Sequence, residues 1–254
     1  RPLSSDCTHA HVRFPFRAGR DDEPAQAYVG GPATVVEQGG DASKIGSVAS
    51  IFVSRLDTLA DALITKRLTA ATNTEARASL SKLLGTVAIA NAKLAYQKYL
   101  ARCRTPAWQR LAEAGAHPQR LLWASTSTKN PAYRDVRYVE ELIGRDTVNT
   151  VPPETLKAFR DHGKPRASLE EGVDEARDVI ASLEHAGISL NDVTDTLVND
   201  GGSKFSEAFD ALLAAVDPGP PIRIRPSSGR QPLTPPPDPA PLATTARPSA
   251  PPPP

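Results

Sequence analysis

The sequence contains no methionine and only two cysteines, Cys7 and Cys103. Two cysteines are too few for the disulfide framework of a small secreted domain, so we expect a protein of the reducing cytoplasm. No apolar run approaches the ~20 residues that a membrane-spanning helix requires, so no membrane span is expected. The net charge is +1. A nearly neutral chain has no field strong enough to favour nucleic acid or an anionic membrane as its partner.

Several functional motifs are also missing. The sequence has no P-loop, no G-x-G-x-x-G fingerprint and no Gly-x-Ser-x-Gly elbow, which argues against the nucleotide-binding and hydrolase classes that depend on them. The pattern Cys7-x-His9-x-His11 does not have the spacing of a standard zinc signature. We therefore predict no metal site.

Both ends of the chain differ in composition from the middle. Residues 1–35 show neither helical nor strand periodicity, and we expect them to be irregular, disordered or non-native. Of the 25 prolines, 15 lie in residues 218–254, so a disordered Pro-rich tail is expected there. Because the chain begins with Arg1 and both ends are rich in Arg, Pro, Ala and Gly, we hypothesise a truncated or frame-damaged copy of a longer enzyme.

In residues 36–217, continuous apolar runs alternate with segments of helical period. Such runs are typical of parallel strands that are buried on both faces. The sequence predicts strands at 48–53, 121–124 and 147–151. It predicts helices at 56–64, 75–103, 106–115, 136–143, 153–163, 168–187, 189–197 and 205–216. This alternation indicates an α/β fold with extra helices at its end.

Glycine and hydroxyl residues predict where several of these helices begin and end. Gly85 is expected to weaken or bend the helix at 75–103. Ser168 and Glu171 fit a capping box at the start of the next-to-last long helix, and Ser189 is a predicted N-cap. The last predicted helix carries the apolar residues Phe209 and Leu212.

A polar loop follows the predicted strand at 121–124. Residues 125–130 are Ser-Thr-Ser-Thr-Lys-Asn, so four hydroxyls, a cation and an amide follow one strand end. Loops in this position carry the chemistry of barrel and doubly wound enzymes.

Several sequence blocks resemble one enzyme family. They are Leu121-Leu-Trp-Ala-Ser-Thr, Thr128-Lys-Asn-Pro-Ala-Tyr, Tyr138-Val-Glu-Glu-Leu-Ile, Asp146-Thr-Val-Asn-Thr-Val-Pro, Lys44-Ile-Gly-Ser-Val-Ala-Ser-Ile-Phe-Val-Ser-Arg-Leu-Asp-Thr and Ile89-Ala-Asn-Ala-Lys-Leu-Ala-Tyr. In this order they are similar to transaldolase, in the bacterial branch related to fusions with glucose-6-phosphate isomerase. The likeness runs from about residue 36 to about residue 216.

The resemblance implies a partial (β/α)₈ TIM barrel, in which the three predicted strands are similar to the sixth, seventh and eighth strands. The implied activity is transfer of a dihydroxyacetone unit in the pentose phosphate pathway. Its sugar phosphates are sedoheptulose 7-phosphate, glyceraldehyde 3-phosphate, erythrose 4-phosphate and fructose 6-phosphate. No metal or organic cofactor is implied, and the oligomeric state is not indicated.

The family uses a Schiff-base lysine on its fourth strand, and its proton-shuttling acid lies on an earlier strand. No lysine of this chain lies in an apolar strand-like run. Lys93 falls in a motif that the family shares, but in a helical segment, where a solvated lysine is expected. We therefore assign no catalytic residue, and we expect the chain to be inactive by itself.

The phosphate-binding end of the family's site is retained. The motif Ser-x-Phe-x-x-Arg occurs as Ser50, Phe52 and Arg55, and Ser125 with Lys129 matches the next strand at a longer spacing. An arginine fork suits phosphate through paired, charge-assisted hydrogen bonds, whereas lysine acts as a point charge. The resemblance therefore implies phosphate binding by these residues.

The residues by themselves leave simpler interpretations open. Arg55 would then form a surface ion pair, Ser50 would only fill space, and Ser125 and Lys129 would belong to a solvated loop. Asn130 before Pro131 could start a turn.

A second function remains open beside the enzyme. The helical part would be a non-enzymatic interaction module whose Pro-rich tail docks into SH3-type grooves.

Overall fold

The computed structural model describes residues 9–13 and 23–216. Contacts divide the chain into two units, residues 1–209 and 210–254. The predicted Pro-rich tail and Cys7 lie outside the described residues. In the described part, no helix has both the length and the apolar character needed to cross a bilayer.

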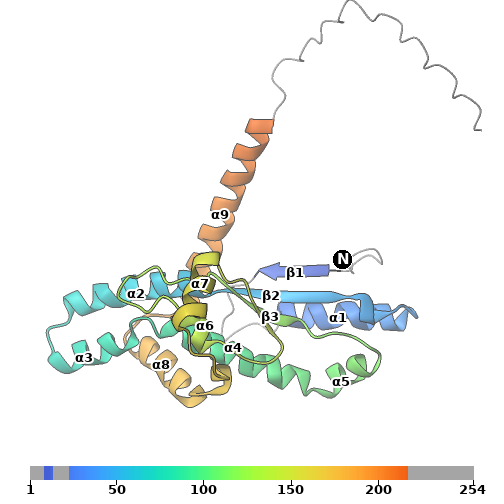
Figure 1. Cartoon of the computed structure of the whole chain (residues 1–254), viewed down its shortest axis with the longest axis horizontal. Coiled ribbons are helices and arrows are strands. Elements are labelled where there is room, and N and C mark those ends of the chain that lie inside the picture. The colour runs from blue at the N-terminus through green and yellow to red at the C-terminus, as the bar shows by residue number, and fades with distance from the viewer. Residues whose placement is uncertain (1–8, 14–22, 217–254) are drawn as a thin grey trace, which may run out of the picture. The chain divides into compact units, whose positions relative to one another are not determined.

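A parallel sheet of four strands is the centre of the first unit, and Figure 1 shows helices α4, α5 and α8 along one side of it. The strands are β1 (His9–Arg13), β2 (Gly46–Phe52), β3 (Arg120–Ala124) and β4 (Thr147–Asn149), in that spatial order. The three predicted strands are thus confirmed as β2, β3 and β4. An open parallel sheet with α-helical crossovers is consistent with part of a TIM-type barrel.

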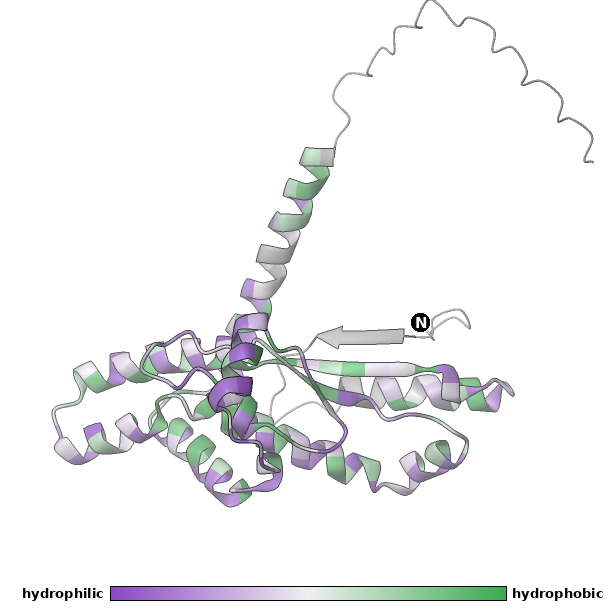
Figure 2. Ribbon diagram, viewed as in Figure 1, coloured by the Kyte–Doolittle hydropathy of each residue, from purple (hydrophilic) through white to green (hydrophobic). Residues whose placement is uncertain are grey.

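The predicted helices occur in the predicted order, but one of them is split, two are merged, and α1 is additional. The helices are α1 (Glu23–Glu37), α2 (Val53–Ala70), α3 (Thr74–Leu83), α4 (Val87–Cys103), α5 (Pro106–Glu113), α6 (Arg137–Glu141), α7 (Pro153–His162), α8 (Val173–His185) and α9 (Leu190–Val216), with short 3₁₀ helices at Ala42–Lys44 and Ser168–Glu170. In Figure 2 hydrophobic and hydrophilic residues alternate along them, as expected for amphipathic helices.

The main core joins one face of the sheet to α2, α3, α4, α8 and the start of α9. Ile51 of β2 lies opposite Trp123 of β3, and both side chains are buried in this core. Because successive strand residues point to opposite faces, Ser50 and Leu122, which also lie opposite each other, point to the other face of the sheet.

The expectation that residues 1–35 are irregular is wrong for β1 and for most of α1. β1 pairs in parallel with β2. A segment of five residues is too short to show a clear periodicity, and it becomes a strand through its hydrogen bonds to the neighbouring strand. Helix α1 contains Pro32 and two glycines, so its helical propensity is poor. Tertiary contacts hold it instead. The Tyr28 hydroxyl donates to the carbonyl of His117 at 2.7 Å, and the Tyr28 ring stacks on Trp108 with centroids 6.4 Å apart.

The predicted helix at 75–103 is two helices, α3 and α4, separated at Gly85. The φ angle of Gly85 is +68°, in the left-handed region that only glycine adopts readily. Gly85 therefore breaks the helix instead of bending it.

The predicted capping box at Ser168 is wrong. The Ser168 hydroxyl donates to the carbonyl of Glu140 at 2.5 Å and accepts from the N–H of Ile143 at 3.3 Å. These long-range partners compete with a local cap, so Ser168 begins a 3₁₀ turn. Helix α8 starts later, after Gly172, whose φ is +62°.

The two predicted C-terminal helices are one continuous helix, α9. Ser189 is its N-cap as predicted, because its hydroxyl accepts from the N–H of Asp192 at 3.2 Å. The side chains of Phe209 and Leu212 are 52% and 58% exposed.

Candidate functional site

Strand β2 runs directly into α2, and Arg55 lies in the first turn of that helix. Arg55 is exposed. Its guanidinium carbon lies 4.8 Å from the centroid of the Phe52 ring, a distance typical of a cation–π contact. This contact holds the cation over the carboxyl end of β2. Ser50 lies within β2, before Phe52, and its side chain is only 1% exposed. The structure therefore does not bring Ser50 to the surface beside Arg55.

Ser125 lies at the carboxyl end of the neighbouring strand, β3. Its φ is +54°, a left-handed conformation that costs a serine about 1 kcal/mol or more and that often marks functional sites. The Ser125 carbonyl accepts from the N–H of Ser54 at 3.0 Å. This hydrogen bond joins the end of β3 to the start of α2, so the Arg55 and Ser125 segments lie side by side.

The residue after Ser125 is tied to the next strand. Thr126 is fully buried, and its hydroxyl donates to the Oδ1 of Asn149 at 2.9 Å, at the end of β4. The start of the polar loop is therefore fixed against the ends of both neighbouring strands.

Lys129 lies further along the same loop and is exposed. Its ammonium group donates to the Ser127 hydroxyl at 2.9 Å. Asn130 starts a turn, which was the simpler interpretation of this residue, by accepting from the N–H of Ala132 at 3.0 Å. Ser127 and Thr128 border a cavity of about 840 Å³ between the loop and α7. The other charged residues that line this cavity are Asp135, Glu154, Lys157, Arg160 and Asp161, so it presents charges of both signs.

Lys93 is not the solvated helix lysine that the sequence predicted. It is 7% exposed, and its ammonium group donates to Glu141 Oε2 at 3.3 Å and to the carbonyl of Glu171 at 2.9 Å. Both partners are acceptors, which suit an ammonium group better than the free amine of a nucleophile. In the described chain, Lys93 is the one buried lysine.

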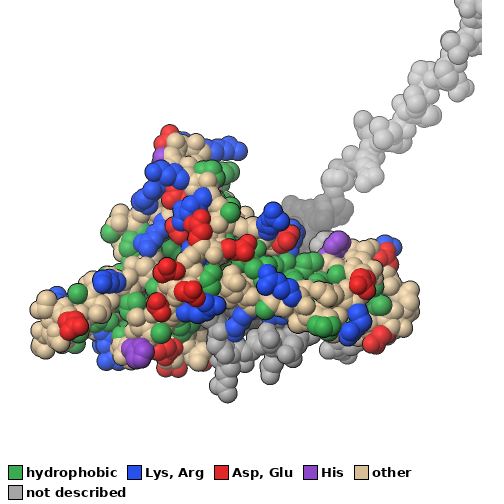
Figure 3. Space-filling model, turned by 90° about the horizontal axis from the view of Figure 1, so that it is seen from below, with side chains coloured by type: hydrophobic (Ala, Val, Ile, Leu, Met, Phe, Trp, Pro, Cys, Tyr) green, Lys and Arg blue, Asp and Glu red, His purple; other side chains and the backbone are tan. Residues whose placement is uncertain are grey.

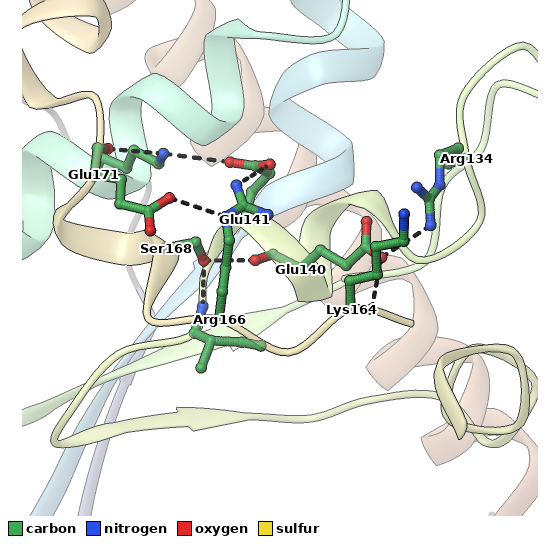
Figure 4. Close-up of polar contacts among 9 residues, drawn as sticks. Arg134, Glu140, Glu141, Lys164, Arg166, Ser168 and Glu171 are labelled. Carbon is green, nitrogen blue, oxygen red and sulfur yellow. Dashed lines mark hydrogen bonds and ion pairs between the residues drawn. The ribbon is translucent and has the colours of Figure 1, made fainter. Parts of the chain in front are cut away.

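Glu141 is the centre of this network. Figure 4 shows Arg166 reaching both Glu141 and Glu171, at 2.6 Å and 2.9 Å. Burial acts to raise the pKa of Glu141, but the Arg166 hydrogen bond and the Lys93 charge outweigh it and hold that pKa below its usual value. The network fastens α6 to α4 and to the segment before α8.

The neighbouring Glu140 has its own set of partners. Its Oε1 accepts from Arg134 and from the N–H of Lys164, both at 2.9 Å. Figure 4 shows these contacts on the opposite side of α6 from the Glu141 network.

Two carboxylates of α2, which sequence reasoning missed, bind two tyrosines of the β3–α6 segment. Asp57 accepts from the Tyr138 hydroxyl at 2.7 Å, and Asp61 accepts from the Tyr133 hydroxyl at 2.6 Å. Burial raises the pKa of Asp57 to about 6, although hydrogen bonds from Ala88 and Tyr138 act in the opposite direction. The sequence pattern that could have indicated these residues is a pair of acids four residues apart, beside the apolar stripe of the predicted helix.

Charges of both signs are interspersed on the face of the described residues in Figure 3, and no extended patch of one sign appears there. Across the residues that the structure describes, no group of His, Cys, Asp and Glu side chains is arranged to hold a metal ion. The strands β1 to β4 contain no lysine. What the carboxyl edge presents is an arginine, hydroxyls and a lysine, which suit an anion such as a phosphate group.

The family model for transaldolase and fructose-6-phosphate aldolase matches residues 23–216. This chain belongs to that transaldolase/fructose-6-phosphate aldolase family. The match begins at α1, so the family region includes a helix that the sequence blocks did not cover.

Curated proteins that are similar to this transaldolase-family chain are also named transaldolases. It is 46% identical over 208 residues to a transaldolase of Thiobacillus denitrificans, covering 82% of this chain and 56% of the relative. It is 43% identical over 215 residues to a transaldolase of Trichodesmium erythraeum, covering 84% and 57%. A protein named transaldolase 2 from Nostoc punctiforme is 47% identical over 196 residues, covering 76% and 51%. The chain spans about half the length of the curated relatives it matches.

Proposed function

We propose that this chain carries the phosphate-binding end of a transaldolase-type transferase. In the whole enzyme, a lysine amine forms a Schiff base with a ketose phosphate, and a dihydroxyacetone unit passes to an aldose phosphate. The proposed substrates are sedoheptulose 7-phosphate, fructose 6-phosphate, erythrose 4-phosphate and glyceraldehyde 3-phosphate. The chemistry needs no metal and no organic cofactor.

The observation that carries this proposal is the 3.0 Å hydrogen bond between Ser54 and Ser125, which sets two strand ends side by side. One end presents Arg55, and the other leads into the loop with Ser125 and Lys129. Two cations and several hydroxyls at one edge can neutralise and hydrogen-bond a phosphate dianion. Barrel enzymes bind phosphate beside their last strands, which supports this placement.

A binding experiment tests the phosphate end. Titration calorimetry would compare fructose 6-phosphate with fructose on the 254-residue chain. Arg55→Ala should weaken binding of the phosphate ester by about tenfold or more, the factor expected for a charge-assisted hydrogen bond. Arg177→Ala is the matched control, because Arg177 is an exposed arginine on α8 that pairs only with Asp174 in the described contacts. Equal affinities for the two variants would refute the proposal.

We also propose that the chain by itself is catalytically incompetent. The strands β1 to β4 contain no lysine, and the buried Lys93 is engaged by Glu141 and Glu171. Borohydride reduction in the presence of fructose 6-phosphate should leave the intact mass of the chain unchanged, whereas a full-length relative named transaldolase provides the positive control. A covalent adduct on Lys93 or Lys129 would contradict the proposal and would identify the nucleophile.

A further inference from the structure

The loop that carries Ser125 and Lys129 is tied to α2 at both of its ends. At its start, the Ser125 carbonyl accepts from Ser54 at 3.0 Å. Near its far end, the Tyr133 hydroxyl donates to Asp61 Oδ2 at 2.6 Å. Helix α2 is the helix whose first turn presents Arg55. The two halves of the proposed phosphate end are thus joined twice, with Lys129 between the joints.

The Tyr133–Asp61 bridge has a defined geometry. The second oxygen of Asp61 accepts from the N–H of Gly85 at 2.8 Å. A Cβ at Gly85 would lie 2.6 Å from the Tyr133 ring, so only glycine leaves room for the ring at this place. The Arg137 guanidinium lies 5.0 Å from the centroid of the same ring. Contacts with Gly85 and Arg137 therefore orient the Tyr133 ring so that its hydroxyl reaches Asp61.

Other contacts order separate parts of this loop: the Thr126 hydroxyl binds Asn149, Asn130 accepts from Ala132, and Arg134 pairs with Glu140. Residues 125–136 contain neither helix nor strand, so no ladder of backbone hydrogen bonds orders them. Holding a flexible, exposed lysine in one place opposes binding through lost conformational freedom, unless the loop is already ordered. A side-chain bridge to a rigid helix supplies that order before the ligand arrives.

We propose that Tyr133 and Asp61 are positioning residues for the phosphate end: their bridge holds the 125–136 loop against α2, so that Lys129 and Arg55 meet the same anion. This inference rests on the proposed function. Neither residue contacts the ligand. They act through Lys129, and their removal lowers affinity without removing a ligand contact.

The neighbouring Tyr138–Asp57 bridge provides a matched comparison. It has the same chemistry and nearly the same length, 2.7 Å. Tyr138 lies in α6 and is buried in the core, whereas Tyr133 lies in the loop. Tyr138→Phe therefore removes an equivalent hydrogen bond without releasing the loop.

The test is a double-mutant cycle on the 254-residue chain, with the affinity for fructose 6-phosphate measured by titration calorimetry. Tyr133→Phe should weaken binding about three- to tenfold, the factor associated with ordering one or two side chains. In a Lys129→Ala background, Tyr133→Phe should have no further effect. Tyr138→Phe should lower the denaturation midpoint and leave the affinity of the folded chain within about twofold.

Each other outcome overturns the inference in a distinguishable way. If Lys129→Ala and Arg55→Ala leave the affinity unchanged, both the proposed function and the bridge's role are refuted. If they weaken binding but Tyr133→Phe does not, only the positioning role is refuted. The same conclusion follows if Tyr133→Phe weakens binding equally with and without Lys129, because a bridge that acts only on general stability would do so.

Discussion

The carboxyl group of Asp57 should make the stability of the fold depend on pH in an unusual direction. This side chain is 1% exposed, and it accepts hydrogen bonds from the N–H of Ala88 at 2.8 Å and from the Tyr138 hydroxyl at 2.7 Å. Burial nevertheless dominates and raises its pKa from 3.8 to about 6. A carboxyl whose pKa is raised by folding favours the folded state while it is protonated, and that contribution disappears as the pH rises through about 6.

The size of the effect follows from the two pKa values. The difference between 3.8 in the unfolded chain and about 6 in the fold corresponds to about 3 kcal/mol. Asp57→Asn removes the titration and keeps an amide oxygen that accepts a hydrogen bond. Between pH 4 and pH 7, the wild-type chain should therefore lose most of this, about 2 kcal/mol of unfolding free energy relative to this variant.

Urea denaturation followed by the fluorescence of the buried Trp108 and Trp123 measures this difference at each pH. Taking the difference between the two proteins cancels the titration of every other group. Asp174→Asn, at an exposed carboxylate on α8, controls for the loss of one negative charge. A difference between wild type and Asp57→Asn that is flat from pH 4 to pH 7, or that has the opposite slope, would refute the reasoning.

Two further substitutions test local features of the fold. Gly85→Ala places an L residue at a φ of +68° and a Cβ 2.6 Å from the Tyr133 ring, so it should lower the unfolding free energy by about 1–3 kcal/mol. A loss below about 0.5 kcal/mol in urea denaturation would contradict this. Hydrogen bonds to Asp135 and Asp161 raise the pKa of His162 above 6.5, so its charged form stabilises the fold at low pH and this contribution fades as the pH rises through that raised value. An NMR titration should show the raised pKa and its return toward 6.5 in Asp135→Asn; identical titration curves would exclude the pairing.

Much of the local structure was predictable because its causes are local. Helix α5 begins at Pro106 because Thr105 caps it, its hydroxyl accepting from the N–H of Trp108 at 3.3 Å. Helix α8 ends where Gly187 adopts a φ of +72°. Helix α9 begins after Ser189. In each case the residue's own backbone preference or nearest hydrogen bond decides the outcome, so a short window of sequence contains the information.

The errors occurred where a distant partner overrides a local pattern. Ser168 has the spacing of a capping box, yet it bonds to Glu140 and Ile143, 28 and 25 residues away. Lys93 resembles a solvated helix lysine, but its partners Glu141 and Glu171 are 48 and 78 residues away. A side chain is buried by whatever packs over it, and periodicity within one helix does not identify that neighbour.

The same division holds for the candidate site. The order of apolar runs and polar loops in the sequence determined that Arg55 follows one parallel strand and Ser125 follows another, because in such a sheet loops of this kind gather at the carboxyl edge. Only the tertiary structure decided that Ser50 is buried, that the Ser54 N–H binds the Ser125 carbonyl, and that Asp61 binds Tyr133, 72 residues away. Strand pairing and side-chain bridges are contacts between distant segments, and their geometry exists only once the chain has folded.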